Sequence, residues 1–391
     1  MQSQPSLQRY TASAPENILL VDDSPANLRL LSQILGEHGY GVRAVTSGPR
    51  ALASVELTPP DLILLDIRMP EMDGFEVCQQ LKANPRTADV PILFISALDD
   101  IQDKMRAFST GGVDYITKPF QLEEVIARVE THLALRRLQR NLQDANQRME
   151  RELALAAQGQ ASFMPRILPD VPGWQLSVTL IPARTTSGDF YDVVLLPTGR
   201  LAILIADVVD KGVGAALYMA MSCALLRAYT GEHPNNPELA CQAVNERLIE
   251  YATADQFVTV FLGILDPQSG TLVYSNAGHN PPILLRPNEP DRTQLLRNTG
   301  LPLGVSEEGV WSSKSVQLAP GDVLVLYTDG VTDAESADGD FYDLSRLVET
   351  VSQNTRGAAA ELRDAILDDV HNFTRGAAQS DDMAVMVLAR Q

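Results

Sequence analysis

The stretch LILLDIRMP (62–70) carries four apolar residues directly into the carboxylate of Asp66. A short apolar run bounded by turn residues is typical of a buried strand, where a charged end requires an explanation. The arrangement recurs in ILIADVVDKG (203–212) and in VLVLYTDG (323–330), each with an aspartate after the apolar run. One aspartate at a strand end is an ordinary turn residue, but three in one chain indicate carboxylates gathered around cations.

The composition is that of a globular and strongly acidic chain. Its 391 residues are too many for one compact core and predict two domains joined by a connector. Hydrophobic residues make up 45% and charged residues 21%, which excludes disorder for most of the chain. The net charge of −19 argues against nucleic acid as a partner, because neutralising phosphates requires clustered lysine and arginine.

Cysteine usage and the first residues predict a cytoplasmic protein. Cys78, Cys223 and Cys241 lie outside any CxxC spacing and are expected to be small core residues in a reducing compartment. Residues 1–15 are polar, lack the apolar core of a signal peptide, and are expected to form a flexible N-terminus. No stretch approaches the roughly 20 apolar residues needed to cross a bilayer, so no membrane is expected as a partner.

Between residues 16 and 133, short apolar runs alternate with segments of helical periodicity. The apolar runs are expected to be strands and the periodic segments helices. Five strands alternating with helices predict an α/β domain with a five-stranded, parallel, doubly wound sheet. The expected strands lie within NILLVDD (17–23), GVRAVTSG (41–48), DLILLDIRMP (61–70), VPILFISA (90–97) and DYITKP (114–119).

Five polar side chains fall at the carboxyl ends of these strands, where doubly wound sheets bind ligands. Three of them are carboxylates, and crowding raises the pKa of at least one unless a cation neutralises them. A hard divalent ion with oxygen ligands, such as Mg²⁺, meets that need. A hydroxyl and an ammonium could then hold phosphoryl oxygens while one carboxylate acts as nucleophile. The five residues are Asp22, Asp23, Asp66, Ser96 and Lys118.

Residues 16–133 resemble a response-regulator receiver domain, whose fold is flavodoxin-like. The resemblance rests on VDDS (21–24), LLDIRMPEMDG (64–74), FISA (94–97) and DYITKPF (114–120). It implies that Asp66 is phosphorylated by a cognate histidine kinase or phosphotransfer protein. It also implies a Mg²⁺ ion bound directly by Asp23 and Asp66 and supported through water by Asp22. The backbone carbonyl of Arg68 would complete the protein ligands.

The same resemblance assigns roles around the phosphoryl group. Ser96 and Lys118 would bind its oxygens, and Tyr115 would be the aromatic switch that follows Ser96. The Lys118–Pro119 bond would be cis. Taken singly, each of these residues is more simply explained by a structural role than by a functional one. A strand-end aspartate is usually a turn former, and Tyr115 can simply pack on an edge strand. The family's order and spacing outweigh that interpretation for the set as a whole.

Residues 122–160 contain neither glycine nor proline before Gly159 and are expected to form one long helix, with 134–160 as the linker. Apolar residues recur in it at three- and four-residue steps, the pattern of a coiled-coil seam, which favours a homodimer through the linker. A charge-laced single helix docked on one domain is the alternative. The seam residues are Leu135, Leu138, Leu142, Ala145 and Met149.

From residue 161 to 391 the pattern changes to β-rich segments bounded by turn residues, with three longer helical segments. Such a pattern predicts an α+β sandwich, in which helices cover sheets. The expected strands are WQLSVTLIP (174–182), DFYDVVLLP (189–197), RLAILIADVV (200–209), FVTVFLGILDP (257–267), TLVYSNAGH (271–279), PPILLR (281–286), DVLVLYTDG (322–330) and MAVMVLAR (383–390). The expected helices are 215–231, 236–254 and 356–374, and the apolar stripe of the first is expected to be core.

Acidic residues again stand at strand ends, and several lie beside glycines, which let backbone segments approach closely. No histidines or cysteines occur at ligand spacing, which disfavours zinc and favours Mg²⁺ or Mn²⁺. Two such ions bridged by a water would provide a hydroxide-like nucleophile for attack on a phosphate ester. The glycines are Gly188, Gly212 and Gly330, and the carboxylates are Asp189, Asp207, Asp329, Asp381 and Asp382.

This second region is similar to the metal-dependent serine/threonine phosphatases (PPM, protein phosphatase 2C-like), in the bacterial SpoIIE and RsbU branch. The resemblance rests on SGDFYDV (187–193), ADVVDKGVGAAL (206–217), FVTVFLGILDPQSGTLVYSNAGHNPP (257–282), GLPLGV (300–305), LAPGDVLVLYTDGVTDA (318–334) and DDMAVMV (381–387). The implied ligands are Asp189, Asp207 and the Val208 carbonyl for one ion, and the bridging Asp207 with Asp329 and Asp381 for the second. Asp382 stays open as the alternative to Asp381.

The chain departs from the family pattern in one loop. Asp210 stands where glycine is usual, Val209 where serine is frequent, and Gly214 where proline is frequent. None of these removes a ligand, so activity is expected while the geometry of the loop is in question. Arg184 is a candidate for gripping phosphate, with a surface position as the alternative. His279 is expected to hold a turn rather than to act as a general acid.

These resemblances together imply a two-component response regulator whose phosphorylation controls a metal-dependent serine/threonine phosphatase. In this branch the substrate is a phosphorylated STAS-type anti-anti-sigma protein in a partner-switching pathway, and that substrate is implied by the resemblance alone. A catalytically weak adaptor that binds a regulatory partner is the alternative. A transcription factor is a weaker third, because no basic recognition helix follows the receiver region.

Overall fold

A computed structural model describes residues 15–96, 101–119, 121–251, 256–287, 289, 292–354 and 357–391, without the side chains of 101–103. The N-terminus expected to be flexible therefore lies, up to residue 14, outside the described residues. The chain divides into two compact units, Met1–Gln147 and Arg148–Gln391. Each unit has its own sheets and core, and the two are described separately.

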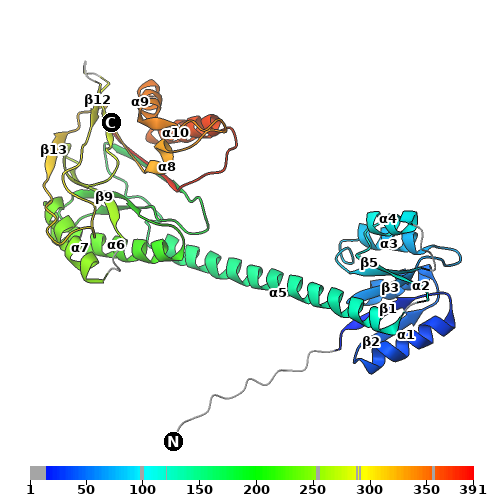
Figure 1. Cartoon of the computed structure of the whole chain (residues 1–391). Helices are drawn as coiled ribbons and strands as arrows, with labels where there is room; N and C mark the ends of the chain where they lie inside the picture. The colour runs from blue at the N-terminus through cyan, green and yellow to red at the C-terminus, as the bar shows by residue number, and fades with distance from the viewer. Residues whose placement is uncertain are drawn as a thin grey trace, which may run out of the picture. The chain divides into compact units, whose positions relative to one another are not determined.

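In the described part of the first unit, five parallel strands form a sheet of order β2-β1-β3-β4-β5, with helices on both faces (Figure 1). This confirms the doubly wound α/β fold. The strands are β1 (Asn17–Val21), β2 (Gly41–Val45), β3 (Leu62–Asp66), β4 (Ile92–Ser96) and β5 (Asp114–Thr117). The helices are α1 (Pro25–Glu37), α2 (Gly48–Leu57), α3 (Gly74–Ala83), α4 (Ile101–Ser109) and the start of α5 (Leu122–Ala161).

Burial explains why these segments form this sheet. All residues of β3 and β4 are buried, as expected for central strands covered on both faces. The N-terminus of α3 is closed by a capping box, in which the Asp73 carboxylate accepts from the Glu76 amide at 2.8 Å and the Glu76 side chain accepts from the Asp73 amide at 3.0 Å. This cap fixes the loop that follows Asp66.

Helix α5 is continuous over 40 residues, Leu122–Ala161, which confirms the expected long helix. Its first turns bury Val125, Val129 and Leu133 against the sheet of the first unit. Arg136 is also buried there, and its guanidinium donates to the backbone carbonyls of Pro60 and Asp61. Residues 137–152 are exposed throughout, so the two parts of the helix differ in surroundings.

The described residues of the second unit form two antiparallel sheets, of order β13-β10-β9-β8-β7 and β12-β11-β14-β15-β6, which confirms the sandwich. The strands are β6 (Trp174–Ile181), β7 (Phe190–Leu195), β8 (Leu201–Val208), β9 (Val258–Asp266), β10 (Thr271–Ala277), β11 (Ile283–Leu285), β12 (Thr293–Leu295), β13 (Lys314–Gln317), β14 (Val323–Tyr327) and β15 (Met383–Arg390). The helices are α6 (Val213–Glu232), α7 (Pro237–Tyr251), α8 (Asp329–Thr332), α9 (Asp343–Gln353) and α10 (Ala359–Thr374).

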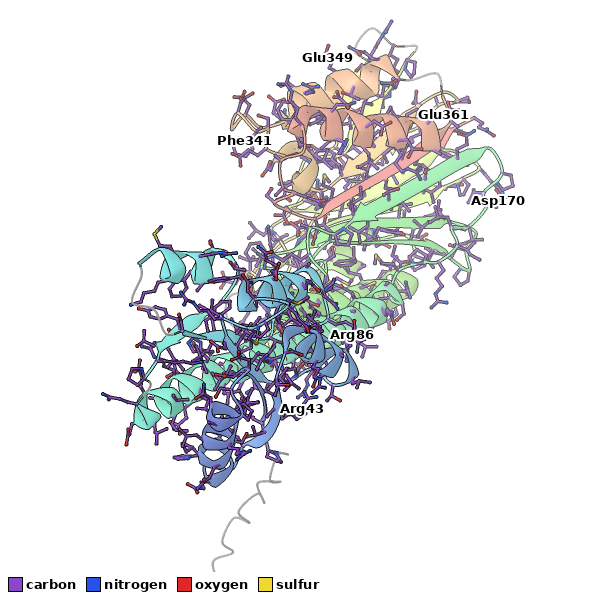
Figure 2. The ribbon with its side chains drawn as sticks, turned by 90° about the vertical axis from the view of Figure 1, so that its right-hand side faces the viewer. Arg43, Arg86, Asp170, Phe341, Glu349 and Glu361 are labelled. Carbon is purple, nitrogen blue, oxygen red and sulfur yellow. The ribbon has the colours of Figure 1, made fainter. Side chains whose placement is uncertain are left out.

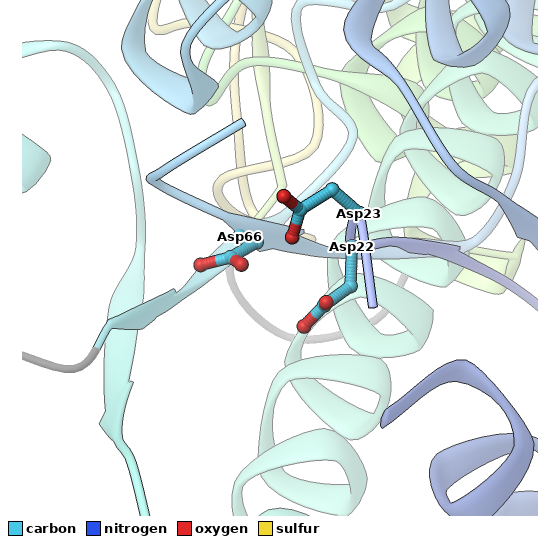
Figure 3. A group of neighbouring side chains, drawn as sticks. All are labelled: Asp22, Asp23 and Asp66. Carbon is cyan, nitrogen blue, oxygen red and sulfur yellow. The ribbon is translucent and has the colours of Figure 1, made fainter. Parts of the chain in front are cut away.

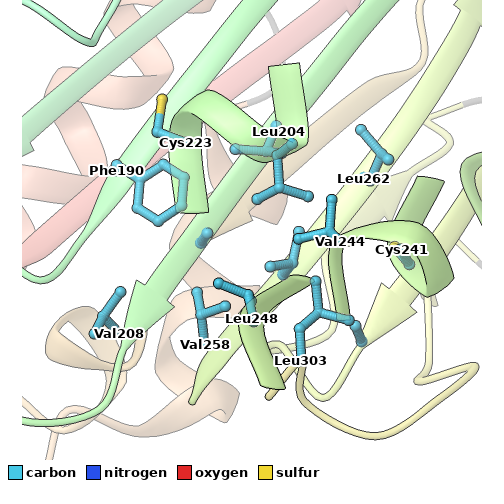
Figure 4. Packing of buried hydrophobic residues seen from close by; sticks show 14 of the residues in the cluster. Phe190, Leu204, Val208, Cys223, Cys241, Val244, Leu248, Val258, Leu262 and Leu303 are labelled. Atoms are coloured by element: carbon cyan, nitrogen blue, oxygen red, sulfur yellow. The ribbon is translucent and has the colours of Figure 1, made fainter. Parts of the chain in front are cut away.

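Apolar layers hold these elements together. The inner faces of the two sheets meet in one cluster that includes Ile203 and Met386. Helices α6 and α7 pack on the outer face of the first sheet, where Cys223 and Val244 are among the buried side chains (Figure 4). Helices α9 and α10, which carry Glu349 and Glu361 on the outside of the unit in Figure 2, cover the second sheet. The order of layers is helix, sheet, sheet, helix.

Three features of this unit differ from the expectation. Helix α6 is long and apolar enough by composition to cross a membrane, whereas no such stretch was expected. It packs Met219 and Leu226 into the core, and this burial explains its apolar character without a membrane. The short strands β12 and β13 were not expected, because their segments are too short to stand out by periodicity. The helix α9 was missed, although Leu344, Leu347, Val348 and Val351 recur in it at helical spacing.

Candidate functional site

The first site lies at the carboxyl ends of the parallel strands. Asp22 and Asp23 follow β1, and Asp66 is the last residue of β3, so the neighbouring strands bring the three carboxylates together (Figure 3). Each offers an oxygen that lies within 4.8 Å of an oxygen from the other two. Asp22 and Asp66 are buried, and Asp23 is exposed toward solvent. The convergence predicted from the strand ends is therefore present.

Lys118, which follows β5, is the cation of this site. Its Nζ lies 2.8 Å from Asp22 Oδ2 and 2.8 Å from Asp66 Oδ2. Burial raises the pKa of Asp66 above its ordinary value, although the Lys118 ammonium opposes the shift. Burial by itself would lower the pKa of Lys118, but the hydrogen bonds with Asp22 and Asp66 outweigh it and the net shift is upward. The ammonium is thus held charged between two carboxylates.

The charges of this site fit a divalent cation. Three carboxylates and one ammonium leave a formal charge of −2 (−3 + 1) at the mouth of the site. Asp23 and Arg68 line an open hollow of about 540 Å³, which gives an ion and a phosphoryl group room to enter. Oxygen donors around a solvent-accessible space are the surroundings that Mg²⁺ prefers.

Ser96 and Tyr115 lie beside the carboxylates on β4 and β5. Ser96 is the last residue of β4 and is buried, and its carbonyl accepts from the Lys118 amide at 2.6 Å. The Lys118–Pro119 bond is cis, as expected. The Tyr115 ring is half-buried, edge-on to Phe108 at 6.0 Å between centroids, and Lys104 Nζ lies 4.8 Å from its centre. Tyr115 therefore packs against α4 in this conformation.

The second site forms where the two sheets of the second unit end. Strand β7 pairs Phe190 with Ala206 of β8, so Asp189, which precedes Phe190, and Asp207, which follows Ala206, lie beside one another. Strand β14 pairs Tyr327 with Val385 of β15, which places Asp329 near the residues that precede β15. Four segments that are far apart in sequence thus deliver the carboxylates of residues 189, 207, 329 and 381.

Two glycines permit this approach. A Cβ on Gly188 would lie 2.9 Å from the Val208 carbonyl oxygen, and one on Gly330 would clash with the carbonyl oxygen of Asp382. Only glycine fits where two backbone segments approach so closely. Gly212 was expected to serve the same purpose, but nothing lies within 4 Å of its Cβ position, and its φ of +92° is what requires glycine.

Burial and mutual repulsion perturb the carboxyl groups of this site. Burial, and then the charge of Asp207, raise the pKa of Asp189 well above its ordinary value. Burial, and then the charge of Asp329, raise the pKa of Asp207 to about 7. The pKa of Asp329 is raised by burial and by the charge of Asp381. Neighbouring carboxylates therefore repel one another, and a bound cation would reduce that repulsion throughout the set.

The structure separates Asp381 from Asp382, the two alternatives for one ligand position. The Asp382 carboxylate is buried and accepts three hydrogen bonds, from the Ala183 amide at 2.7 Å, the Ser187 hydroxyl at 2.8 Å and the Gly188 amide at 2.7 Å. The Asp381 side chain is 38% exposed. Asp382 holds the loop before Asp189, whereas the Asp381 carboxylate is partly open to solvent and stays the predicted ligand.

Lys211 is the ammonium of the second site, although the sequence patterns pointed to no role for it. Its Nζ lies 2.9 Å from Asp381 Oδ2 and donates to the Ser380 carbonyl at 2.7 Å. One ammonium facing the carboxylates of residues 189, 207, 329 and 381 leaves a formal charge of −3 (−4 + 1). Among the described residues, a group of three carboxylates with oxygens all within 4.8 Å of one another occurs at Asp22, Asp23 and Asp66 alone, so the second set is more widely spaced. A donor set shared between two ions has that property.

Comparison with known proteins agrees with this architecture. A family model described as Stage II sporulation protein E (SpoIIE) matches residues 197–391, and a model described as the response regulator receiver domain matches residues 18–130. The chain therefore carries a receiver domain followed by a SpoIIE-type, PP2C-like domain. Phosphatases of this class use divalent metal ions, which fits the oxygen donors of the second site.

Individual proteins match most of the chain or a part of it. Protein IcfG of Synechocystis sp. is 32% identical over 398 residues, which cover 95% of this chain and 58% of IcfG, so the chain spans little more than half of that relative. The DNA-binding dual master transcriptional regulator RpaA of Synechocystis sp. is 47% identical over 116 residues, covering 30% of this chain and 48% of RpaA. The SiaA PP2C domain of Pseudomonas aeruginosa matches with a TM-score of 0.58 and 18% identity, covering 63% of this chain and 99% of that domain, which shows the fold.

Two residues considered from the sequence for other roles are also placed in the PP2C-like domain. Arg184 is exposed, in agreement with the surface alternative. His279 is buried at 2% exposure, its Nδ1 lies 2.8 Å from Thr259 Oγ1, and its amide donates to Asn276 Oδ1 at 2.8 Å. Its Nε2 faces the Tyr327 carbonyl outside hydrogen-bonding geometry. A histidine enclosed in this way holds a turn.

Sequence reasoning missed two residues that position ligands in the PP2C-like domain. The Thr328 hydroxyl donates to Asp189 Oδ2 at 2.5 Å and accepts from the Ala384 amide at 2.8 Å, which fixes one carboxylate oxygen. Gln160 of α5 bonds to the backbone of Ser187. Thr328 could have been suspected from its place beside Asp329, but nothing in the linker sequence distinguishes Gln160 from its exposed neighbours.

Proposed function

We propose that this chain is a two-component response regulator that controls its own metal-dependent protein serine/threonine phosphatase domain. The observation that carries the proposal is a set of carboxylates in or next to β7, β8, β14 and β15, in which burial and repulsion raise the pKa values of Asp189, Asp207 and Asp329. Without a cationic ligand, such a set would cost stability and serve no structural purpose.

In this proposal Asp189, Asp207 and the Val208 carbonyl hold one divalent ion. Asp207, Asp329 and Asp381 would hold a second ion. Bound Mg²⁺ or Mn²⁺ would supply a water of lowered pKa and would neutralise the phosphate ester. The support is the placement of Asp207 at the end of a rigid buried strand and the close approach of the Val208 carbonyl to Gly188.

The protein side chains then fix the geometry. The Thr328 hydroxyl holds one oxygen of Asp189 by a 2.5 Å hydrogen bond. Lys211, 2.9 Å from Asp381, can turn its ammonium toward the phosphate of a substrate once Asp381 is engaged elsewhere. Lys211 is given that role ahead of Arg184 because it already lies beside the candidate ligand Asp381. The site excludes little water, because the Asp381 side chain is partly exposed to solvent. An open site of this kind can admit a phosphorylated residue on the surface of a protein substrate.

In the receiver domain, Asp66 is the proposed phosphoacceptor. Asp23 and Asp66, with the Arg68 carbonyl, would bind Mg²⁺, and Asp22 would support it through water. The Lys118 ammonium already lies 2.8 Å from the Asp66 carboxylate and would contact a phosphoryl oxygen there. The donor would be a histidine kinase or phosphotransfer protein.

The remaining two receiver residues would report that phosphorylation. The Ser96 hydroxyl would take a second phosphoryl oxygen, and Tyr115 would respond by moving relative to Phe108 of α4. The change would reach the phosphatase domain through α5, the one element that belongs to both units.

The linker is proposed to pair with that of a second copy. The seam residues are exposed in the single chain. Leu135, Leu138, Leu142 and Met149 have exposed fractions of 52%, 66%, 63% and 62%, and Ala145 is exposed as well. Packing them against the same helix of a second copy would bury them. Replacing Leu138 and Leu142 by glutamate should give monomers in sedimentation, whereas Gln143→Glu, off the seam, should leave a dimer.

The proposed substrate is a phosphoserine or phosphothreonine of a STAS-type anti-anti-sigma protein in the cytoplasm. We infer this from the SpoIIE-type family, and it is the least supported step. The test is turnover of such a phosphoprotein and of p-nitrophenyl phosphate by the full chain in Mn²⁺, with and without a phosphoryl mimic on Asp66. The mimic should change the rate, in a direction that the assay decides.

Asp207→Asn and Asp329→Asn should abolish turnover while circular dichroism shows an unchanged fold. Glu349→Gln, an exposed change on α9, is the control and should keep the rate. If the wild-type chain binds Mn²⁺ through Asp207 but turns over no substrate, the chain is instead an adaptor that binds a regulatory partner under receiver control.

A further inference from the structure

A buried amide joins the last turn of α5 to the loop that precedes Asp189. Gln160 is 7% exposed, unlike the residues around it on the helix. Its Nε2 donates to the Ser187 carbonyl, and its Oε1 accepts from the Ser187 amide at 3.1 Å. The side chain of one linker residue therefore satisfies both backbone groups of one loop residue, as a neighbouring strand would.

The bonded residue belongs to the network that positions the candidate ligands. The Ser187 hydroxyl donates to Asp382 Oδ2 at 2.8 Å, and the Gly188 amide donates to the same oxygen at 2.7 Å. Asp189 is the next residue along the chain, and Asp381 precedes Asp382. A displacement of Ser187 would therefore move Asp189 directly and Asp381 through its neighbour.

The segment after α5 is fastened to the same domain a few residues later. The Phe163 carbonyl accepts from Arg227 of α6 at 2.7 Å, and the Arg227 Nε lies 2.6 Å from Asp192 Oδ2 on β7. This attachment keeps the end of the helix close to the loop. Gln160, by contrast, is a residue of the helix itself and bonds directly to the loop.

We propose that Gln160 is a positioning residue through which the linker helix sets the place of Asp189 and hence the affinity of the domain for its metal ions. Turning the helix by one residue rotates a side chain by about 100°, which would withdraw Gln160 from Ser187. Two buried backbone groups would then lack partners, at a cost that favours a moved loop. The inference rests on the proposed phosphatase function, because it concerns the same metal site.

A purely structural role for Gln160 makes a different prediction. In that case its loss lowers the stability of the domain but leaves the metal affinity as it was. The inference requires the metal affinity itself to fall, since hydrogen-bond partners that orient a metal ligand are typically worth about 10- to 100-fold in affinity. The two interpretations are separated by measuring Mn²⁺ binding independently of turnover.

The test uses the full chain and the rise of its thermal unfolding midpoint with Mn²⁺, read by tryptophan fluorescence. Both tryptophans of the sequence, Trp174 and Trp311, lie in the second unit, so Mn²⁺ in the receiver does not contribute directly. Gln160→Leu should require at least about tenfold more Mn²⁺ for the same rise. The control is Gln158→Leu, which changes an exposed residue two positions away and should match the wild type.

Turnover at saturating Mn²⁺ is measured alongside. Gln160→Leu should recover most of the wild-type kcat there, with an unchanged KM for the phosphoprotein, because its defect is in metal binding. If Gln160→Leu does not fold, Gln160→Glu carries the test. It keeps the size of the side chain but cannot donate to the Ser187 carbonyl, and it should show the same loss of affinity.

The outcomes separate the inference from the proposed function. A Gln160 variant that unfolds at a lower temperature but responds to Mn²⁺ like the wild type overturns the inference alone. A wild-type chain that binds Mn²⁺ in an Asp207-dependent way without turnover overturns the proposed phosphatase activity and leaves the inference standing if the Gln160 variant binds more weakly. Absence of any Asp207-dependent Mn²⁺ effect overturns both.

Discussion

Replacing His279 by glutamine should change how the stability of the PP2C-like domain depends on pH. Burial lowers the pKa of His279 from its ordinary 6.5 to about 4. The unfolded chain therefore takes up a proton at this residue before the folded chain does. The stabilisation is fully present above about pH 6.5 and is lost as the pH falls toward the folded pKa.

The magnitude follows from the two pKa values. A difference of about 2.5 units at about 1.4 kcal/mol per unit amounts to about 3 kcal/mol in total. At about pH 5, where the unfolded imidazole is charged and the folded one is neutral, about 2 kcal/mol of it is already lost. Glutamine does not titrate, so the difference in unfolding free energy between the wild type and His279→Gln should shrink by about 2 kcal/mol between about pH 7.5 and pH 5.

Urea unfolding followed by tryptophan fluorescence measures this difference, because Trp174 and Trp311 both lie in the second unit and are largely buried. His371→Gln, a change of an exposed histidine in the same unit, is the control for loss of any imidazole. A gap between the wild type and His279→Gln that stays constant with pH would refute the reasoning. His279→Gln should also keep its turnover near neutral pH, since the imidazole holds a turn and transfers no proton.

Three further changes test other contacts. Asp382→Ala should destabilise the second unit by about 3 kcal/mol in urea unfolding, because three donors lose their acceptor. Asp381→Ala should leave the stability nearly unchanged but weaken Mn²⁺ binding. Asp210→Gly should stabilise the PP2C-like domain by up to about 1 kcal/mol in the same assay, since Asp210 has a φ of +85° that glycine adopts without strain. A loss of stability in this variant would contradict the explanation. Arg136→Ala should lower the free energy of unfolding of the receiver domain by about 2 kcal/mol, because backbone carbonyls lose their donor, and circular dichroism should show an earlier unfolding midpoint. Arg148→Ala, at an exposed position of the same helix, is the control.

Asp210 illustrates how a departure from a family pattern is resolved by the backbone. The sequence showed an aspartate where the family usually has glycine, and left the loop geometry in question. The structure has a positive φ at this position, which is the conformation that glycine supplies at no steric cost. Aspartate is among the residues that tolerate it, and its own carboxylate accepts from the Lys211 amide at 2.8 Å. Asp210 therefore keeps the loop conformation that glycine would give, at a moderate cost in folding free energy.

The sequence by itself determined the alternation of strands and helices in the receiver, the long connector, the sandwich, and the strand ends on which Asp66, Asp207 and Asp329 lie. These follow from local periodicity and from turn residues, which depend on neighbours a few positions away. Only the tertiary structure distinguished Asp381 from Asp382, because the hydrogen bond that commits Asp382 comes from a residue 195 positions earlier in the chain.

The same reason applies to Gln160 and to α6. Gln160 is one of several similar polar residues in a linker, and its burial exists only because the loop at Ser187 folds against it. Helix α6 is apolar enough to suggest a membrane, and only its packing against β8 and α7 shows what covers it. A pattern within one segment reveals which element forms, whereas the partner of a buried polar or apolar face is set by distant segments that meet when the chain folds.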